Sequence, residues 1–244
     1  MADAFARLAE ELRDPQPVSN AAEAVAGLAV RRVPGAEWAS ITLYRPPTFQ
    51  TVAATDERAR RADHVQYELG SGPCVDAIVD DVVYRPLDLR HDMRWPEFGR
   101  RAAGMGVGSM LSYRMMLQRS DHLVGGLNIY STAVDAFTDE SFDIGLLLTT
   151  YGALALSAAE ATRQVENLRR ALDTNRDIGV AVGILMTRHL LARDRALDLL
   201  LLVSQDTNRK VHDLAISVAE TGDLALPPRL RKLRLDGEEP HATS

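Results

Sequence analysis

The chain has 244 residues, of which 46% are hydrophobic, and this is enough for one large domain or two ordinary ones with a proper core. Its net charge of -6 argues against a general nucleic-acid coat protein, and a single cysteine excludes an internal disulfide. The charge is uneven, because residues 161–235 hold thirteen Arg or Lys and nine Asp or Glu. The amphipathic, charged N-terminal sequence does not resemble a signal peptide, which predicts a cytoplasmic protein without a membrane segment.

The first half of the chain mixes helical and strand-like patterns. Residues 18–32 carry apolar residues at helical spacing, and residues 94–105 are predicted to form a helix between two strands. The strand-like runs, bounded by turn residues, are 38–44, 48–54, 82–86, 107–117 and 122–131. Short connections between neighbouring runs favour an antiparallel sheet, so this half is predicted to be an α+β domain.

From residue 139 the pattern is almost wholly helical. It predicts either one unbroken helix over 139–189 or a helix with breaks at Gly145, Gly152 or Gly179. Its apolar residues follow one another at alternating spacings of four and three, which is typical of a coiled-coil seam. The seam includes Val165, Leu168, Leu172, Asn175 and Val182. We expect a second copy of the chain to pack along this face. Packing against the chain's own domain is the alternative for the upstream part.

Two motifs near the C-terminus resemble a known family. They are IGVAVGILM (178–186) and SQDTNRKVHDLA (204–215), and with their surroundings they resemble the ANTAR domain, an RNA-binding module of bacterial antitermination regulators. The resemblance implies a three-helix bundle that binds RNA. One position departs from the family pattern, because many members have a lysine where this chain has Val182.

Small and polar residues of this stretch are candidates for RNA contact. Ala181 and Gly183 remove bulk from a helix surface, which suits either close helix packing or the approach of a ribose and base. Asn208 is either the cap of the third helix or a reader of a base edge. Cations near the turns are expected to converge on one side of the bundle and to neutralise phosphates. These cations are Arg188, Arg193, Arg195, Arg209 and Lys210, and Arg176 is a further candidate for RNA contact.

The upstream half also resembles a family. The segments VQYELGSGPCVDAIVDD (65–81), RPLDLRHDMRWPEF (85–98) and GVGSMLSYRMML (106–117) resemble the GAF domains that precede ANTAR domains in actinobacterial proteins. The resemblance implies a sensory fold with a central antiparallel sheet flanked by helices, and often a small-molecule pocket. The ligand is not specified by the sequence. The candidate pocket residues are Cys74, Tyr113, Met115 and Asn128.

The sequence favours a binding protein over an enzyme. Cys74 stands at the start of a predicted helix, where the helix dipole lowers a thiol pKa, but a small buried residue is the preferred interpretation. The histidines lack metal-ligand spacing, so neither a metal nor a cofactor is expected. No nucleophile elbow, paired acid motif or kinase signature is present.

The predicted order is an N-terminal helical segment (1–18), a GAF-like sensory domain (19–159), a coiled-coil connector with an ANTAR domain (160–222), and a basic, then flexible, tail (223–244). The resemblance implies a homodimeric regulator that binds paired RNA stem-loops in nascent transcripts and controls transcription termination or translation. The alternatives are a DNA-binding transcription factor, a protein-binding signalling scaffold and a thiol-dependent reductase built on the GAF fold.

Overall fold

The computed structural model describes residues 17–117 and 123–227. The predicted N-terminal helical segment lies almost wholly outside these residues, and so does most of the predicted basic and flexible tail. The chain divides into two compact units, residues 1–164 and 165–244. Helix α6 (Asp139–His189) belongs to both units and has the bounds that its apolar pattern predicts.

A four-stranded sheet in the order β2-β1-β4-β3 forms the centre of the first unit. All three pairs of neighbouring strands are antiparallel, which confirms the predicted arrangement. The strands are β1 (Trp38–Arg45), β2 (Thr48–Ala54), β3 (Ser109–Met116) and β4 (Val124–Ser131). A fifth predicted strand at 82–86 is wrong. Tyr84 forms only an isolated bridge with Ser112, and Pro86 has no N–H with which to continue a ladder.

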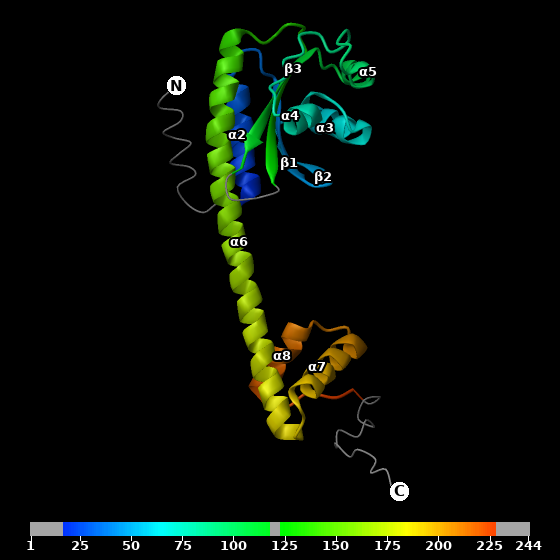
Figure 1. Ribbon diagram of the computed structural model, residues 1–244, viewed down its shortest axis with the longest axis vertical. Helices are drawn as coiled ribbons and strands as arrows, with labels where there is room; N and C mark the ends of the chain where they lie inside the picture. The colour runs from blue at the N-terminus through cyan, green and yellow to red at the C-terminus, as the bar shows by residue number, and fades with distance from the viewer. Residues whose placement is uncertain (1–16, 118–122, 228–244) are drawn as a thin grey trace. The chain divides into compact units, whose positions relative to one another are not determined.

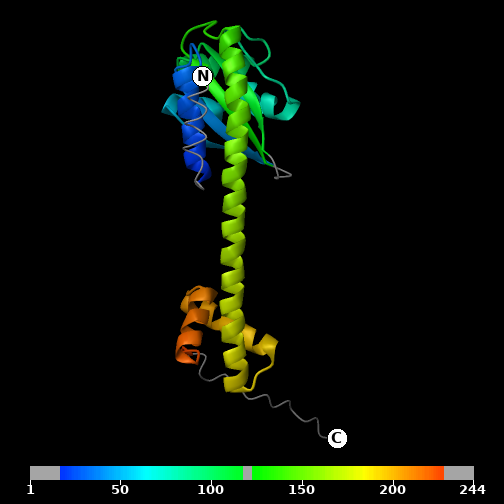
Figure 2. The same ribbon diagram turned by 90° about the vertical axis from the view of Figure 1, so that its left-hand side faces the viewer.

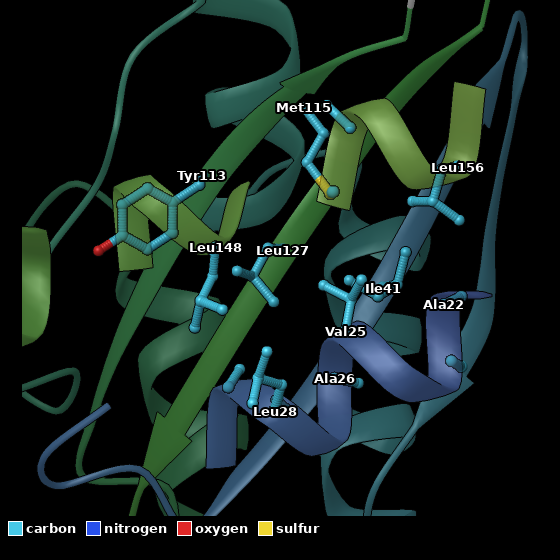
Figure 3. Packing of buried hydrophobic residues seen from close by; sticks show 14 of the residues in the cluster. Ala22, Val25, Ala26, Leu28, Ile41, Tyr113, Met115, Leu127, Leu148 and Leu156 are labelled. Atoms are coloured by element: carbon cyan, nitrogen blue, oxygen red, sulfur yellow. The ribbon is translucent and has the colours of Figure 1, made fainter. Parts of the chain in front are cut away.

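One face of the sheet is apolar and is covered by two helices that lie side by side, α2 (Val18–Arg32) and the first part of α6 (Figures 1 and 2). Val25 of α2 and Leu148 and Leu156 of α6 meet Tyr113 and Met115 of β3 in this core (Figure 3). The close approach of α6 depends on glycine. A Cβ at residue 145 would lie 2.3 Å from the Tyr113 hydroxyl, and one at residue 152 would lie 2.7 Å from Met115 Cε.

The opposite face is covered by α3 (Glu57–Leu69), α4 (Pro73–Asp80) and α5 (Pro96–Gly104) (Figure 1). Helix α5 confirms the helix predicted between two strands. Helix α3 was not predicted, although its ends carry local signals. The Asp56 side chain accepts a hydrogen bond from the Arg58 backbone N–H, and Gly70 ends the helix in the left-handed conformation with a φ of 62°.

In the second unit, the end of α6 packs with α7 (Arg193–Thr207) and α8 (Val211–Thr221), as the predicted three-helix bundle requires. The buried core residues are Ala181, Val182, Leu185, Ala196, Leu199, Leu200, Val203, Leu214, Ala215, Val218 and Leu224. Val182 is only 6% exposed, so its assignment to the dimer seam is wrong. It faces the bundle core of its own chain.

The other predicted seam residues remain exposed on α6. Leu168 is 62% exposed, and Val165, Leu172 and Asn175 are exposed as well. Upstream, α6 uses a different set of residues for its own core, so that Leu147 and Leu154 of the seam also stay exposed. Within the described residues, α6 is the one helix that is long and apolar enough to cross a membrane. Half of its most apolar window is buried inside the fold.

Candidate nucleic-acid interface

The turn between α7 and α8 presents two adjacent cations. Asn208 ends α7 in the left-handed conformation, with a φ of 51°, and the extended Lys210 precedes α8. The Ser204 hydroxyl donates a 2.6 Å hydrogen bond to the Arg209 carbonyl and so closes the turn. Asn208 is therefore the C-terminal cap of α7 rather than the cap of α8, which corrects the predicted capping role. Among the described residues, the exposed side chains of Arg209 and Lys210 have no ion-pair partner.

Arg176 lies at the same end of the bundle as this turn. His212, in the first turn of α8, contacts Asp177 of α6 through Nε2 and Oδ2 at 3.0 Å. This contact holds the start of α8 beside the turn of α6 that contains Arg176. We call Arg176, Arg209 and Lys210 the first cation group, and all three side chains are exposed.

A second cation group, consisting of Arg188 and Arg193, flanks the turn between α6 and α7. Arg188 Nε lies 2.9 Å from Asp223 Oδ2, but its side chain is still 57% exposed. His189 holds the other oxygen of the same carboxylate at 2.9 Å. Arg193 is exposed at the first position of α7, two residues before the exposed Arg195.

The two cation groups do not converge, which corrects the prediction of a single basic side. Arg176 and Arg188 are twelve residues apart on one helix, and this corresponds to about 18 Å at about 1.5 Å per residue. Such a separation suits contacts with distant phosphates of one folded strand better than a single anion site. The first cation group is the stronger candidate because no described carboxylate neutralises Arg209 or Lys210.

The two small residues of the motif have different surroundings. Ala181 is fully buried in the bundle core, so the expectation that it contacts RNA is wrong and the packing alternative holds. Gly183 is exposed, and a Cβ placed there would have no atom within 4 Å. It lines a shallow groove with Val180, Ile184, Thr187, Arg188 and Gly222.

In the first unit, the four predicted pocket residues lie on opposite faces of the sheet. Tyr113 and Met115 are buried in the apolar core beneath α2 and α6 (Figure 3). Cys74 and Asn128 lie on the other face, where Asn128 Nδ2 donates to Cys74 Sγ at 3.1 Å. The prediction of one pocket lined by all four is therefore wrong. Successive residues of a strand point to opposite faces of the sheet. One pocket can therefore be lined by Tyr113 and Met115 or by Cys74 and Asn128, but not by both pairs.

Asn128 belongs to a buried group of polar side chains centred on Asp63 of α3. The Asp63 carboxylate accepts hydrogen bonds from the Tyr130 hydroxyl, from Thr51 Oγ1 at 2.9 Å and from Asn128 Nδ2 at 3.0 Å. Burial raises the pKa of Asp63 to about 6, and these hydrogen bonds limit the rise. Nearby, the buried amide nitrogen of Gln66 has no hydrogen-bond partner among the described residues.

Cys74 is a buried thiol. Burial, and secondly the charge of Asp63, raises the pKa of Cys74 to about 12, which keeps the thiol protonated at neutral pH. Burial thus outweighs any effect of its place at the start of α4, and the preferred interpretation of a small buried residue is confirmed.

The comparison of the second unit with protein families agrees with its bundle. Residues 166–218 match the model of the ANTAR domain, which begins in the last part of α6 and ends within α8. No curated protein sequence matches the chain.

The first unit is similar to solved structures at low identity. The GAF domain of an Acinetobacter phosphoenolpyruvate-protein phosphotransferase is 13% identical, with a TM-score of 0.50 over 66% of this chain and 94% of that one. The GAF domain of the Coxiella burnetii counterpart is 15% identical, with a TM-score of 0.50 over 67% and 96%. The LuxR family factor CepR2 of Burkholderia cenocepacia is 16% identical, with a TM-score of 0.50 over 64% and 94%.

The comparisons agree with the two units, because the first has the fold of GAF domains and the second contains the stretch that matches the ANTAR domain. We call the first unit the GAF unit, after its fold, and the second unit the ANTAR unit, after the match at residues 166–218. The resemblance to the actinobacterial type stays a prediction.

Proposed function

We propose that the chain is a cytoplasmic, homodimeric regulator that binds paired stem-loops in nascent transcripts through its ANTAR domain. In this proposal, the GAF unit receives a signal and controls whether the transcript terminates or is translated. The observation that carries the proposal is the exposed first cation group, which lies within the segment that matches the ANTAR domain.

The chemistry of the first cation group suits an RNA hairpin. Guanidinium and ammonium groups neutralise backbone phosphates, and a guanidinium plane also stacks on unpaired bases of a loop. Arg209 and Lys210 project from a short turn between two helices, so their backbone is ordered before any RNA arrives. Binding then costs mainly the ordering of side chains.

The position that departs from the family pattern offers no contact to RNA. Val182 is packed in the bundle core with Leu185 and Ala181, so in this chain the position serves folding and offers no charge to a ligand. RNA contact then depends more strongly on the turn that carries Arg209 and Lys210.

A dimer provides two copies of the weak RNA contact made by one ANTAR domain. The exposed residues Val165, Leu168 and Leu172 form an apolar stripe, and the exposure of such a stripe to water is unfavourable. Their spacing predicts that a second copy of the chain packs against it. Two linked ANTAR domains bind two neighbouring hairpins with a high effective concentration for the second contact.

The signal is proposed to act on the buried polar group around Asp63. Of the four predicted pocket residues, Cys74 and Asn128 remain candidates for ligand contact, because they lie on this face beside Gln66, whose amide nitrogen has no partner among the described residues. The thiol-dependent reductase is a weaker alternative, because the Cys74 thiol is buried and its raised pKa disfavours the thiolate.

The central experiment replaces both cations of the turn. Arg209→Ala with Lys210→Ala should weaken binding of a tandem-hairpin RNA by about tenfold or more, with a shallower dependence on salt. The matched control is Arg31→Ala with Arg32→Ala, which removes the same charge from an exposed pair at the end of α2. Duplex DNA serves as competitor in the same shift assay. Unchanged hairpin binding by the turn variant, or stronger binding of the duplex, contradicts the proposal.

The dimer is tested separately. Leu168→Glu with Leu172→Glu should give monomers in sedimentation and weaken binding of the tandem hairpins far more than binding of a single hairpin. The control is Met93→Glu with Val79→Glu, because these side chains are also exposed but lie outside the stripe and outside the ANTAR unit. A monomeric unmutated chain would remove the basis of this part.

A further inference from the structure

Helix α6 contains four glycines, and only two of them are explained by the fold of the chain itself. A Cβ at residue 145 or 152 would overlap side chains of the sheet, so those positions need glycine. At residues 179 and 183 a Cβ would meet nothing within 4 Å among the described residues. Glycine is the least favourable helix residue apart from proline, so its use at two open positions, one turn apart, calls for a contact from outside.

The two open glycines continue the exposed apolar stripe. A straight helix turns by about 100° per residue, so residues 179 and 183 lie within about 20° of Leu172 around the axis of α6. Val182 is rotated by about 80° from Leu172 and is buried. The exposed face therefore follows the helical period of about 3.6 residues rather than the heptad spacing of the sequence. This is why the seam runs to Gly179 and Gly183 instead of Val182.

The charged residues of α6 do not oppose the packing of a second copy of α6 against this face. Arg169, Asp173 and Arg176 lie on one flank of the stripe, whereas Gln164, Ala171 and Ile178 on the other flank are uncharged. When two parallel copies meet, the charged flank of each faces the uncharged flank of the other. No like charges are forced together, and no carboxylate becomes buried.

We infer that α6 of a second copy of the chain crosses α6 at Gly179 and Gly183. Two small residues four positions apart allow two helix backbones to approach closely. The groove beside Gly183 is lined by Ile184, Thr187 and Gly222, and Val180, 47% exposed, stands at its rim. Because the same patch meets itself in a twofold dimer, Gly179 and Gly183 of each copy lie against those of the other.

This crossing deepens the proposed function and rests on its dimer. It places a contact between the two copies inside the ANTAR domain itself. The two first cation groups are then held at one separation by direct contact between bundles, and a tandem-hairpin RNA has to match that separation. An unpaired RNA base over Gly183 is the competing occupant of the same groove.

Cysteine crosslinking tests the crossing without adding bulk. Gly183→Cys, in a Cys74→Ser background, should form a disulfide between copies under mild oxidation, because such a bond needs Cα atoms within roughly 4.4–6.8 Å. Gly179→Cys should crosslink as well. Arg170→Cys, on the far side of α6, is the control and should stay reduced. Crosslinking no faster at residue 183 than at residue 170 overturns the inference.

A bulky substitution gives a second, independent measurement on the full chain. Gly183→Leu should raise the dissociation constant of the dimer by about tenfold or more, because the added side chain separates the backbones. Gln205→Leu puts the same side chain on the exposed surface of α7 and should have no effect. Circular dichroism confirms that each variant is folded. An unchanged dimer with lost hairpin binding assigns the groove to RNA and overturns the crossing.

The result is separable from the proposed function. If the unmutated chain binds no hairpin, the proposed function fails, whatever the crosslinking shows. If it binds hairpins and its dimer tolerates Gly183→Leu without crosslinking at residues 179 and 183, only the crossing fails.

Discussion

The two units treat their charged side chains differently. In the GAF unit, the buried Glu160 carboxylate is held by Arg45 at 2.9 Å and by Arg163 at 2.6 Å, and buried Asp63 accepts three side-chain hydrogen bonds. In the ANTAR unit, Arg209 and Lys210 stand exposed without a described ion-pair partner. The buried carboxylates of the GAF unit are paired within the fold, whereas these two cations of the ANTAR unit are open to solvent. The proposed RNA contact falls on these open cations.

A similar contrast, between a buried and an exposed leucine of α6, gives the largest expected effect on the free energy of unfolding. Leu156→Ala removes a fully buried side chain and should lower the free energy of unfolding of the GAF unit by about 2–5 kcal/mol. Leu168→Ala should change it by less than about 0.5 kcal/mol when the chain is monomeric. Both tryptophans, Trp38 and Trp95, are buried in the GAF unit, so denaturation followed by tryptophan fluorescence reports this difference. Similar losses for both variants would remove the contrast.

The second prediction concerns the buried carboxylate and pH. Because burial raises the pKa of Asp63 from 3.8 to about 6, the folded state binds the proton more tightly than the unfolded state. Its contribution to stability is therefore fully present below pH 4 and is lost as the pH rises through 6.

Asp63→Asn removes this dependence. The difference in unfolding free energy between the unmutated chain and the variant should change by about 2 kcal/mol between pH 4 and pH 6.5, at about 1.4 kcal/mol per pKa unit. Carboxylates with lowered pKa values, such as Asp92 and Glu160, contribute equally to the stability of both proteins. Their contributions therefore cancel in the difference. A constant difference across this range would show that Asp63 keeps its ordinary pKa.

The smallest effects come from paired glycine substitutions. Gly145→Ala should destabilise the GAF unit by about 1–3 kcal/mol, because the new Cβ meets the Tyr113 hydroxyl. Gly183→Ala should stabilise the monomeric ANTAR unit by about 0.5–1 kcal/mol, because alanine is the better helix former and has free space. Thermal melting followed by circular dichroism measures both signs. Destabilisation by Gly183→Ala would mean that the position is packed after all.

Much of the fold was predictable because local patterns and packing agree. The strands β1, β2, β3 and β4 and the bounds of α6 follow from alternating and helical apolar spacing. Helix α3 was missed because its buried face includes the polar residues Asp63 and Gln66, which hide the helical pattern. Such a polar side chain is buried only because the sheet supplies its hydrogen-bond partners, and this is not visible in the helix sequence alone.

The candidate site was predictable in its residue types but not in its grouping. The motif identified Arg209 and Lys210, and the charge count favoured a basic C-terminal part. Which end of the bundle each cation occupies depends on the contact between His212 and Asp177, which joins residues far apart in sequence. The burial of Val182 likewise depends on the rotation of α6 against α7 and α8.

Asn208 has a consequence for how this chain can evolve. Its left-handed backbone ends α7, and among ordinary residues asparagine and glycine adopt that conformation most readily. A β-branched residue there would shift the exit direction of the chain and with it the aim of the next two side chains. The cations themselves are free to vary, whereas the asparagine fixes the direction in which the backbone leaves α7. Under the proposed function, substitutions that change the RNA preference are therefore expected at positions 209 and 210 before position 208.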